Sequence, residues 1–188
     1  MDIQSIQTGD TFLYQGTAFI SRAIIHFMEE YRDNFPVDPA IVKLLNGFVP
    51  SHCATLVWIN GVLYLYGSIL FGFKPIVFTD YYSDSDSFLV MRDGLTDQQK
   101  NEVVIDVQKM TGDSAVYPVW ALPMWILYVK THWKGFLSPG GHCAEVCYKS
   151  TYEVKRAVLP DLYNQNPLYI TCFDCIKPNN QIIIDNRK

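Results

Sequence analysis

The sequence lacks an apolar run long enough to cross a membrane. Its longest strongly apolar stretch, Val116–Val129, has 14 residues and is interrupted by Pro118 and Pro123. A spanning helix needs about 20 apolar residues, and internal prolines break helical hydrogen bonding. We therefore predict no stable membrane span. We interpret this stretch, with its neighbouring aromatic residues, as a buried segment or as an apolar wall that faces a substrate.

The sequence also shows neither the pattern of a secretory signal nor that of a disulfide framework. The chain begins MDIQSIQTGD, which has no basic segment followed by an apolar one. It contains 5 cysteines, an odd and low number for 188 residues. Small disulfide-rich domains carry more cysteines, usually in even number. We therefore expect reduced thiols and a cytoplasmic location.

Strong charge of one sign is absent as well. The 15 lysines and arginines are outnumbered by 19 acidic residues, and no basic stripe is visible. Nucleic-acid-binding domains carry clustered basic residues, so we predict no nucleic-acid partner. Hydrophobic residues make up 49% of the chain, which is typical of a globular protein. We expect residues 1–188 to form a single domain.

The apolar pattern predicts an α+β fold, in which antiparallel strands and helices are segregated along the chain. Asn60-Gly61 is a strong signal for a two-residue hairpin turn, and Thr96 with Gln99 forms a capping box that opens a helix. Strands are expected at 11–14, 51–59, 62–66, 76–78, 87–92, 168–173 and 181–184, and helices at 18–31, from 97 to about 111, and at 143–154.

Cys143 is the candidate nucleophile. It follows the glycine-rich loop Ser138–Gly141 and lies at the expected start of a helix. Unpaired backbone N–H groups and the helix dipole stabilise a thiolate at such a position, and the same N–H groups could hold an oxyanion. The alternative is that Cys143 is a small buried residue, as most cysteines are.

A thiol nucleophile needs a base within hydrogen-bond reach, and His52 is the candidate. Its position at the start of a strand, after a proline loop, places it where a sheet meets a loop. The other histidines are His26, His132 and His142, of which the last is adjacent to Cys143 and is expected to point away from it. On position alone, the pattern favours an ordinary histidine with structural contacts over a catalytic base.

Several motifs occur in a fixed order along the chain: Gly9-Asp10, then Ser51-His52 at a strand, then Cys143-Ala144-Glu145 at a helix start, then Leu159–Tyr163 (LPDLY). This order resembles the permuted papain-like amidases, which are circularly permuted relatives of the NlpC/P60 cysteine peptidases. The bacterial YiiX/YebB group and lecithin retinol acyltransferase-type enzymes belong to the same broad set. The resemblance spans most of the chain.

The resemblance implies a circularly permuted papain-like fold, with a small antiparallel sheet packed against a nucleophile helix. It implies a cysteine hydrolase or acyltransferase in which His52 takes the proton of Cys143 and a covalent thioester forms. The implied substrates are amides, such as peptides, isopeptides or cell-wall fragments, or alternatively lipid acyl esters. No metal or organic cofactor is expected.

The third member of the site departs from the family pattern, which usually has a glutamate on the strand after the histidine. With a two-residue turn at Asn60-Gly61, alternation places position 67 diagonally next to His52. That residue is Gly67, which has no side chain. Ser68 could orient His52 instead if a β-bulge turned it to the same face. A backbone carbonyl, a water molecule or a distant residue are alternatives.

Two other readings of the function remain open. Gly67 would suit a catalytically degenerate binding module of the same fold, and the apolar stretch Val116–Val129 would suit an enzyme that remodels lipid acyl groups at a membrane surface. Cys172-Phe-Asp-Cys175 is interpreted as structural, because no second pair of ligands at zinc-binding spacing accompanies it.

Overall fold

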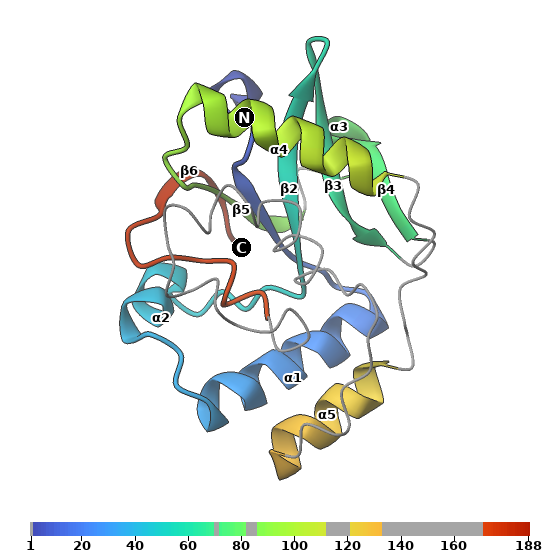
Figure 1. Cartoon of the computed structure of the whole chain (residues 1–188). Helices are drawn as coiled ribbons and strands as arrows, with labels where there is room; N and C mark the ends of the chain where they lie inside the picture. Colours follow the sequence, from blue (N-terminus) through green and yellow to red (C-terminus); the bar gives the residue numbers. More distant parts are fainter. Residues whose placement is uncertain (1, 70–71, 82–85, 112–120, 133–170) are drawn as a thin grey trace.

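The computed structural model describes residues 2–69, 72–81, 86–111, 121–132 and 171–188. These residues form a six-stranded sheet of order β4-β3-β2-β1-β5-β6 in which every neighbouring pair is antiparallel (Figure 1). The elements in chain order are η1 (Ile3–Ser5), β1 (Thr11–Gln15), α1 (Phe19–Asn34), α2 (Pro39–Leu45), β2 (His52–Ile59), β3 (Val62–Ile69), β4 (Gly72–Val77), α3 (Phe78–Tyr81), β5 (Ser87–Arg92), α4 (Asp97–Met110), α5 (Ala121–Thr131) and β6 (Gln181–Asn186).

The β2–β3 hairpin has the predicted turn and register. Asn60 and Gly61 have φ values of 51° and 77°, the two positive angles that a type I′ turn requires. Pairing then runs without interruption from Ile59 opposite Val62 to Thr55 opposite Tyr66. Because the turn fixes this register, it also fixes which residues lie at the far end of the hairpin.

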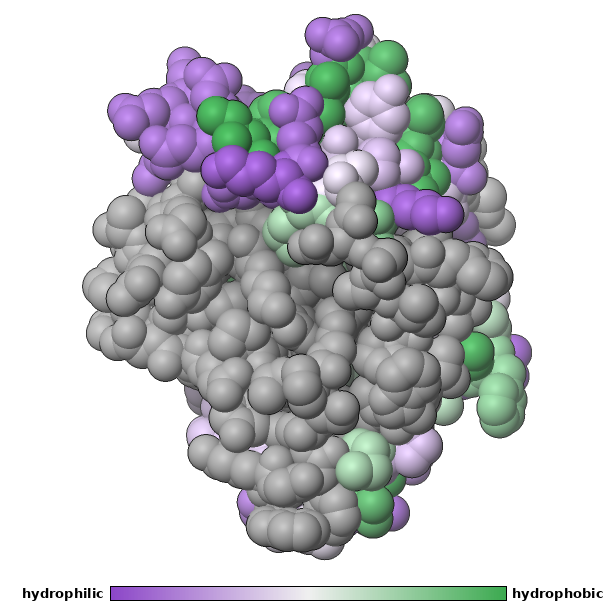
Figure 2. Space-filling view, turned by 45° about the vertical axis from the view of Figure 1, so that its right-hand side comes forward, coloured by the Kyte–Doolittle hydropathy of each residue, from purple (hydrophilic) through white to green (hydrophobic). Residues whose placement is uncertain are grey.

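Helix α4 begins at the predicted capping box and covers one face of the sheet. The Gln99 N–H donates to the Thr96 hydroxyl at 3.3 Å, and the Thr96 N–H donates to the Gln99 side chain at 2.9 Å. Val103 and Val107 are fully buried against Val57 and its neighbours. Hydrophilic and hydrophobic residues alternate over the top of the molecule, where α4 and the hairpin tip lie (Figures 1 and 2).

Strand alternation divides the buried side chains into a core on each face of the sheet. On the face of α1, α2 and α5 the core contains Leu13, Cys53 and Leu89 together with residues of these helices. On the opposite face, Phe12, Ala54, Leu56, Leu65 and Phe88 pack against Phe78 of α3. None of the helices in the described ranges is long and apolar enough to cross a membrane.

Two expected strands were wrong in part. The strand expected at 76–78 begins earlier, at Gly72, and Phe78 starts a helical turn because its ring packs edge-on against Phe12, 5.5 Å between centroids. The end of the strand expected at 168–173 is a turn, since the backbone and hydroxyl of Thr171 both donate to the Asp174 carboxylate at 2.7 Å. The helix expected at 143–154 lies outside the described residues.

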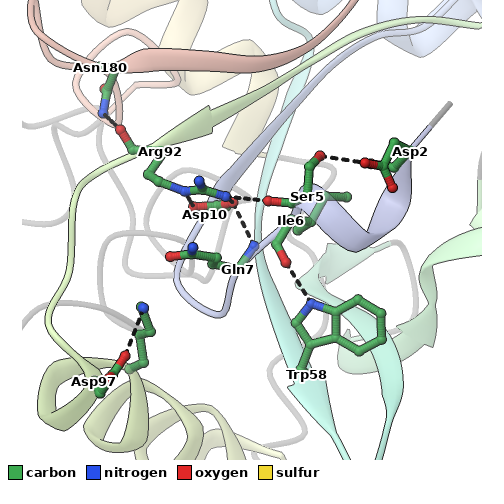
Figure 3. Close-up of polar contacts among 10 residues, drawn as sticks. Asp2, Ser5, Ile6, Gln7, Asp10, Trp58, Arg92, Asp97 and Asn180 are labelled. Atoms are coloured by element: carbon green, nitrogen blue, oxygen red, sulfur yellow. Dashed lines mark hydrogen bonds and ion pairs between the residues drawn. The ribbon is translucent and has the colours of Figure 1, made fainter.

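The Gly9-Asp10 motif anchors the start of β1. Asp10 is 2% exposed, and its carboxylate accepts hydrogen bonds from the Gln7 backbone at 2.8 Å and from Arg92 of β5 at 3.0 and 3.2 Å (Figure 3). Burial raises the pKa of Asp10, and the Arg92 guanidinium offsets part of this effect. Arg92 also donates to the Ser5 carbonyl, so one ion pair joins η1, β1 and β5. The motif is therefore structural.

We expect Asp10→Ala to lower the free energy of unfolding by about 3 kcal/mol, because it leaves a largely buried guanidinium without its carboxylate. Guanidinium chloride unfolding would measure the change. Asp33→Ala is the matched control, since Asp33 pairs with Arg32 on the surface at 3.4 Å and should cost less than about 1 kcal/mol. Equal effects of the two substitutions would contradict the anchoring role.

Candidate functional site

The predicted nucleophile Cys143 lies outside the described residues, as does the glycine-rich loop before it. The described part of the candidate site contains its predicted base, His52. His52 is the first residue of β2, a central strand, and lies opposite Tyr14 of β1. It occupies the end of the hairpin that is remote from the Asn60-Gly61 turn.

Ser51 fixes the backbone immediately before His52. Its N–H and its hydroxyl both donate to the Tyr14 carbonyl, at 2.9 and 3.1 Å, and its oxygen accepts from the Gly16 N–H at 3.0 Å. Ser51 is only 3% exposed, so these bonds are shielded from water. The serine of the Ser-His motif thus ties the start of β2 to the end of β1 and to the turn that precedes α1.

Gly67 of β3 lies directly against the imidazole of His52, as the register analysis predicted. A Cβ atom at position 67 would be 3.1 Å from His52 Nε2, 3.6 Å from Cε1 and 3.0 Å from the Cβ of Ala54. The contacts at 3.0 and 3.1 Å are tighter than ordinary van der Waals contact, so a side chain here would require Ala54 and the imidazole to move by a few tenths of an ångström. Glycine leaves the space that the imidazole edge needs.

The Nε2 atom of His52 is buried and has no hydrogen-bond partner within the part of the chain that the structure describes. A buried ring nitrogen without a partner costs about 1–3 kcal/mol. Such groups are uncommon in folded proteins, and each one calls for a structural or chemical reason. Here the nitrogen faces position 67, where the family pattern would supply an orienting carboxylate.

Aromatic rings surround the imidazole on this face of the sheet. The Tyr81 ring of α3 lies 6.1 Å from the His52 ring, with 34° between their planes. Tyr81 in turn contacts Phe12 at 6.0 Å and Tyr14 at 5.8 Å, both in edge-on arrangements. These separations are those of favourable ring contacts. Sequence reasoning missed Tyr81, because it predicted no helical turn after the strand expected at 76–78.

The carboxylate of Asp86 lies near these aromatic rings and is hydrogen-bonded to one of them, Tyr14. The Tyr14 hydroxyl donates to Asp86 Oδ1 at 3.4 Å. Burial raises the pKa of Tyr14, and the negative charge of Asp86 raises it further. Asp86 also accepts a hydrogen bond from Asn186 through its backbone carbonyl. Nothing in the sequence pattern around Asp86 indicates this contact with Tyr14.

The orienting role of Ser68 stays a prediction. Its side chain is not among those described, whereas its backbone is. The pairing of β3 with β4 runs regularly through Gly67 opposite Lys74 and Ser68 opposite Phe73. The register shift on which the Ser68 hypothesis depends is therefore not found in this pairing.

The structure places two other histidines away from His52. His26 lies on α1 with its side chain 76% exposed, 3.7 Å from Glu30. His132 follows α5, and its ring packs 4.9 Å from that of Phe35. His142 lies outside the described residues. Among the described histidines, His52 alone combines a central strand position with a buried ring nitrogen that lacks a partner.

The described cysteines belong to the core. Cys53, Cys172 and Cys175 are all buried, and the sulfur of Cys53 lies 3.9 Å from that of Cys175. Cys53 points to the face opposite His52, as alternation predicts, and packs with Leu13 and Leu89. These contacts agree with the structural interpretation of the Cys172–Cys175 pair.

The arrangement of the whole chain matches the crystal structure of the metalloprotein YiiX from Escherichia coli O157:H7 (DUF1105), with a TM-score of 0.61. The chain has the YiiX fold. The match covers 98% of this chain and 99% of YiiX, at 14% sequence identity. No protein-family model and no curated protein sequence matches the chain.

The YiiX match confirms the predicted fold class. The α+β organisation, the antiparallel sheet and the full-length correspondence all agree with the family that the motifs resemble. At 14% identity the likeness to YiiX establishes the fold alone, since one fold can carry many different functions.

We expect Ser51→Ala to lower the free energy of unfolding by about 1–2 kcal/mol, because the buried Gly16 N–H loses its acceptor. Chemical denaturation would measure this change. Ser87→Ala is the control, since the Ser87 hydroxyl accepts one exposed bond from Lys188 at 3.2 Å. An equally small effect at both serines would show that Ser51 does not hold the start of β2.

Proposed function

We propose that the chain is a cysteine hydrolase or acyltransferase in which Cys143 is the nucleophile and His52 is the general base. The observation that carries the proposal is the His52 ring at the end of a central strand, with a buried Nε2 facing Gly67 and no partner for it in the described ranges. The YiiX fold supports the proposal, because the motif order resembles the same group of proteins.

In the proposed reaction, His52 removes the proton of the Cys143 thiol and the thiolate attacks a carbonyl carbon. Because Nε2 is enclosed beside Gly67 and Ala54, we assign the proton transfer to Nδ1. The new C–S bond gives a tetrahedral oxyanion, which collapses as the amine or alcohol departs with the proton from the imidazolium. Water or another acceptor then attacks the thioester, which releases the acyl product and restores the thiol.

The proposed chemistry defines the type of bond that is attacked in the substrate. Peptides, isopeptides and cell-wall fragments offer amide carbonyls, and acyl lipids offer ester carbonyls. A thiolate attacks both kinds of carbon, so we propose an acyl donor of either type.

YiiX is described as a metalloprotein, so the fit of a metal to this chain has to be considered. Within residues 2–69, 72–81, 86–111, 121–132 and 171–188, no three His, Cys, Asp or Glu side chains are placed to hold a metal ion. The described residues therefore do not fit a metal centre, and no step of the proposed reaction is routed through one.

A non-catalytic binding module of the same fold is the second candidate. Gly67 favours the binding module, because the position that usually carries the residue orienting the histidine is a glycine in this chain. The two candidates differ in one measurable property, which is the reactivity of the Cys143 thiol.

The test is the pH dependence of Cys143 alkylation by iodoacetamide, mapped by mass spectrometry. A thiol with an ordinary pKa near 8.5 is only about 0.3% ionised at pH 6. We expect rapid labelling of Cys143 at pH 6 in the wild type and about 100-fold slower labelling in His52→Ala. The buried Cys53, Cys172 and Cys175 should label slowly in both proteins.

His26→Ala is the matched control, because it removes an exposed imidazole from α1. It should leave the labelling profile unchanged. If wild-type Cys143 reacts only near pH 8.5 and His52→Ala has no effect, the hydrolase proposal fails and the binding module is favoured. If activation is established, amide and ester substrates can be screened directly.

A further inference from the structure

His52 needs something to fix its ring, and the described residues offer no hydrogen bond for this at Nε2. We infer that Tyr81 is a positioning residue for His52, whose ring sets the orientation that a carboxylate sets in related sites. This inference rests on the proposed function. Tyr81 has no assigned role in the proposed proton transfer and acts only through its contact with the imidazole.

The backbone of β3 limits the imidazole on its Nε2 edge. Gly67 and Ala54 lie so close that a single added carbon at position 67 would come within 3.1 Å of Nε2. The Nε2 edge of the ring is therefore buried beside the β3 backbone at Gly67. A close steric boundary restricts rotation even where no hydrogen bond is made, since closely packed side chains are confined to few rotamers.

Tyr81 supplies a second boundary, at 6.1 Å between ring centroids and 34° between planes. Its own ring is held by edge-on contacts with Phe12, at 81° between planes, and with Tyr14, at 66°. Phe12 is fully buried, so this contact ties Tyr81 to the core of the sheet. The position of the imidazole is thereby linked to rigid packing through one intermediate ring.

Tyr14 stabilises the same group from β1. It pairs with His52 across the strands, and its hydroxyl is bonded to Asp86 at 3.4 Å. Within the part of the chain that the structure describes, Tyr14, Tyr81 and Asp86 are titratable groups of this cluster, and Lys74 lies opposite Gly67 on β4. Burial and the charge of Asp86 raise the pKa of Tyr14, so a change in the labelling profile near pH 6 would report on the Cys143–His52 pair.

The positioning role requires the ring of Tyr81 and not its hydroxyl. Variants that keep or remove the ring should therefore differ. Tyr81→Phe keeps the ring and should retain the wild-type pH profile of Cys143 alkylation. Tyr81→Ala removes the ring and should slow labelling at pH 6 by about tenfold, because a loosely held base loses alignment with the thiol. Tyr81→Leu serves as a second variant if the alanine protein is poorly folded, which thermal unfolding would reveal.

Tyr64→Ala is the matched control for loss of an aromatic ring. Tyr64 is half-buried on β3 and packs with Tyr66 and the α4 side of the sheet, away from His52. This variant should leave the labelling profile at its wild-type position, even if it lowers the melting temperature.

The outcomes separate this inference from the proposed function. Ordinary thiol reactivity of wild-type Cys143 would overturn both. An activated wild-type thiol with an unchanged profile in Tyr81→Ala and Tyr81→Leu would overturn the positioning role alone. A loss in Tyr81→Phe equal to that in Tyr81→Ala would also overturn it, because the hydroxyl and not the ring would then be required.

Discussion

The antiparallel pairing of β1 with β2 is the constraint on which the rest of the site depends. These are the two central strands, and a slip of one residue between them would turn every side chain to the opposite face. The register is secured at both ends. Leu56 exchanges backbone hydrogen bonds with Gly9 and Asp10 at 2.8 and 2.9 Å, and Ser51 bonds to Tyr14 at the other end. Gly9-Asp10 and Ser51 therefore act on the backbone, and the register that they secure fixes the face of the sheet on which His52 lies.

Once this register is set, the neighbours of the His52 side chain are fixed as well. The β2–β3 turn places Gly67 beside its ring, and β1 places Tyr14 opposite. The resulting burial of Nε2 costs about 1–3 kcal/mol, a sizeable part of the 5–15 kcal/mol by which a domain is typically stable. The surrounding core has to offset that cost. Buried polar atoms without a partner are uncommon in folded proteins, and this makes His52 a candidate for a chemical role.

Features with a local cause could be predicted from the sequence, and features that depend on tertiary packing could not. The Asn60-Gly61 turn and the Thr96 capping box depend on neighbouring residues, and both were confirmed. The contact of His52 with position 67 followed from the turn by counting along two strands. The helical turn at Phe78 was missed because it depends on a ring contact with Phe12, distant in the sequence. The place of Tyr81 beside His52 depends on that turn and was missed with it.

Because Gly67 has no side chain, position 67 cannot supply a negative charge to stabilise a protonated His52 in the proposed site. A carboxylate beside the imidazole would both fix its orientation and stabilise its protonated form. Packing by Tyr81 can supply only the first of these effects, and the carboxylate of Asp86 is bonded to Tyr14. In the proposed mechanism, the thiolate of Cys143 supplies a counter-charge for an imidazolium at position 52. Coulombic attraction falls with distance, so this mutual stabilisation depends closely on alignment. A site of this kind relies on the rigidity of its ring contacts more heavily than one with a complete triad.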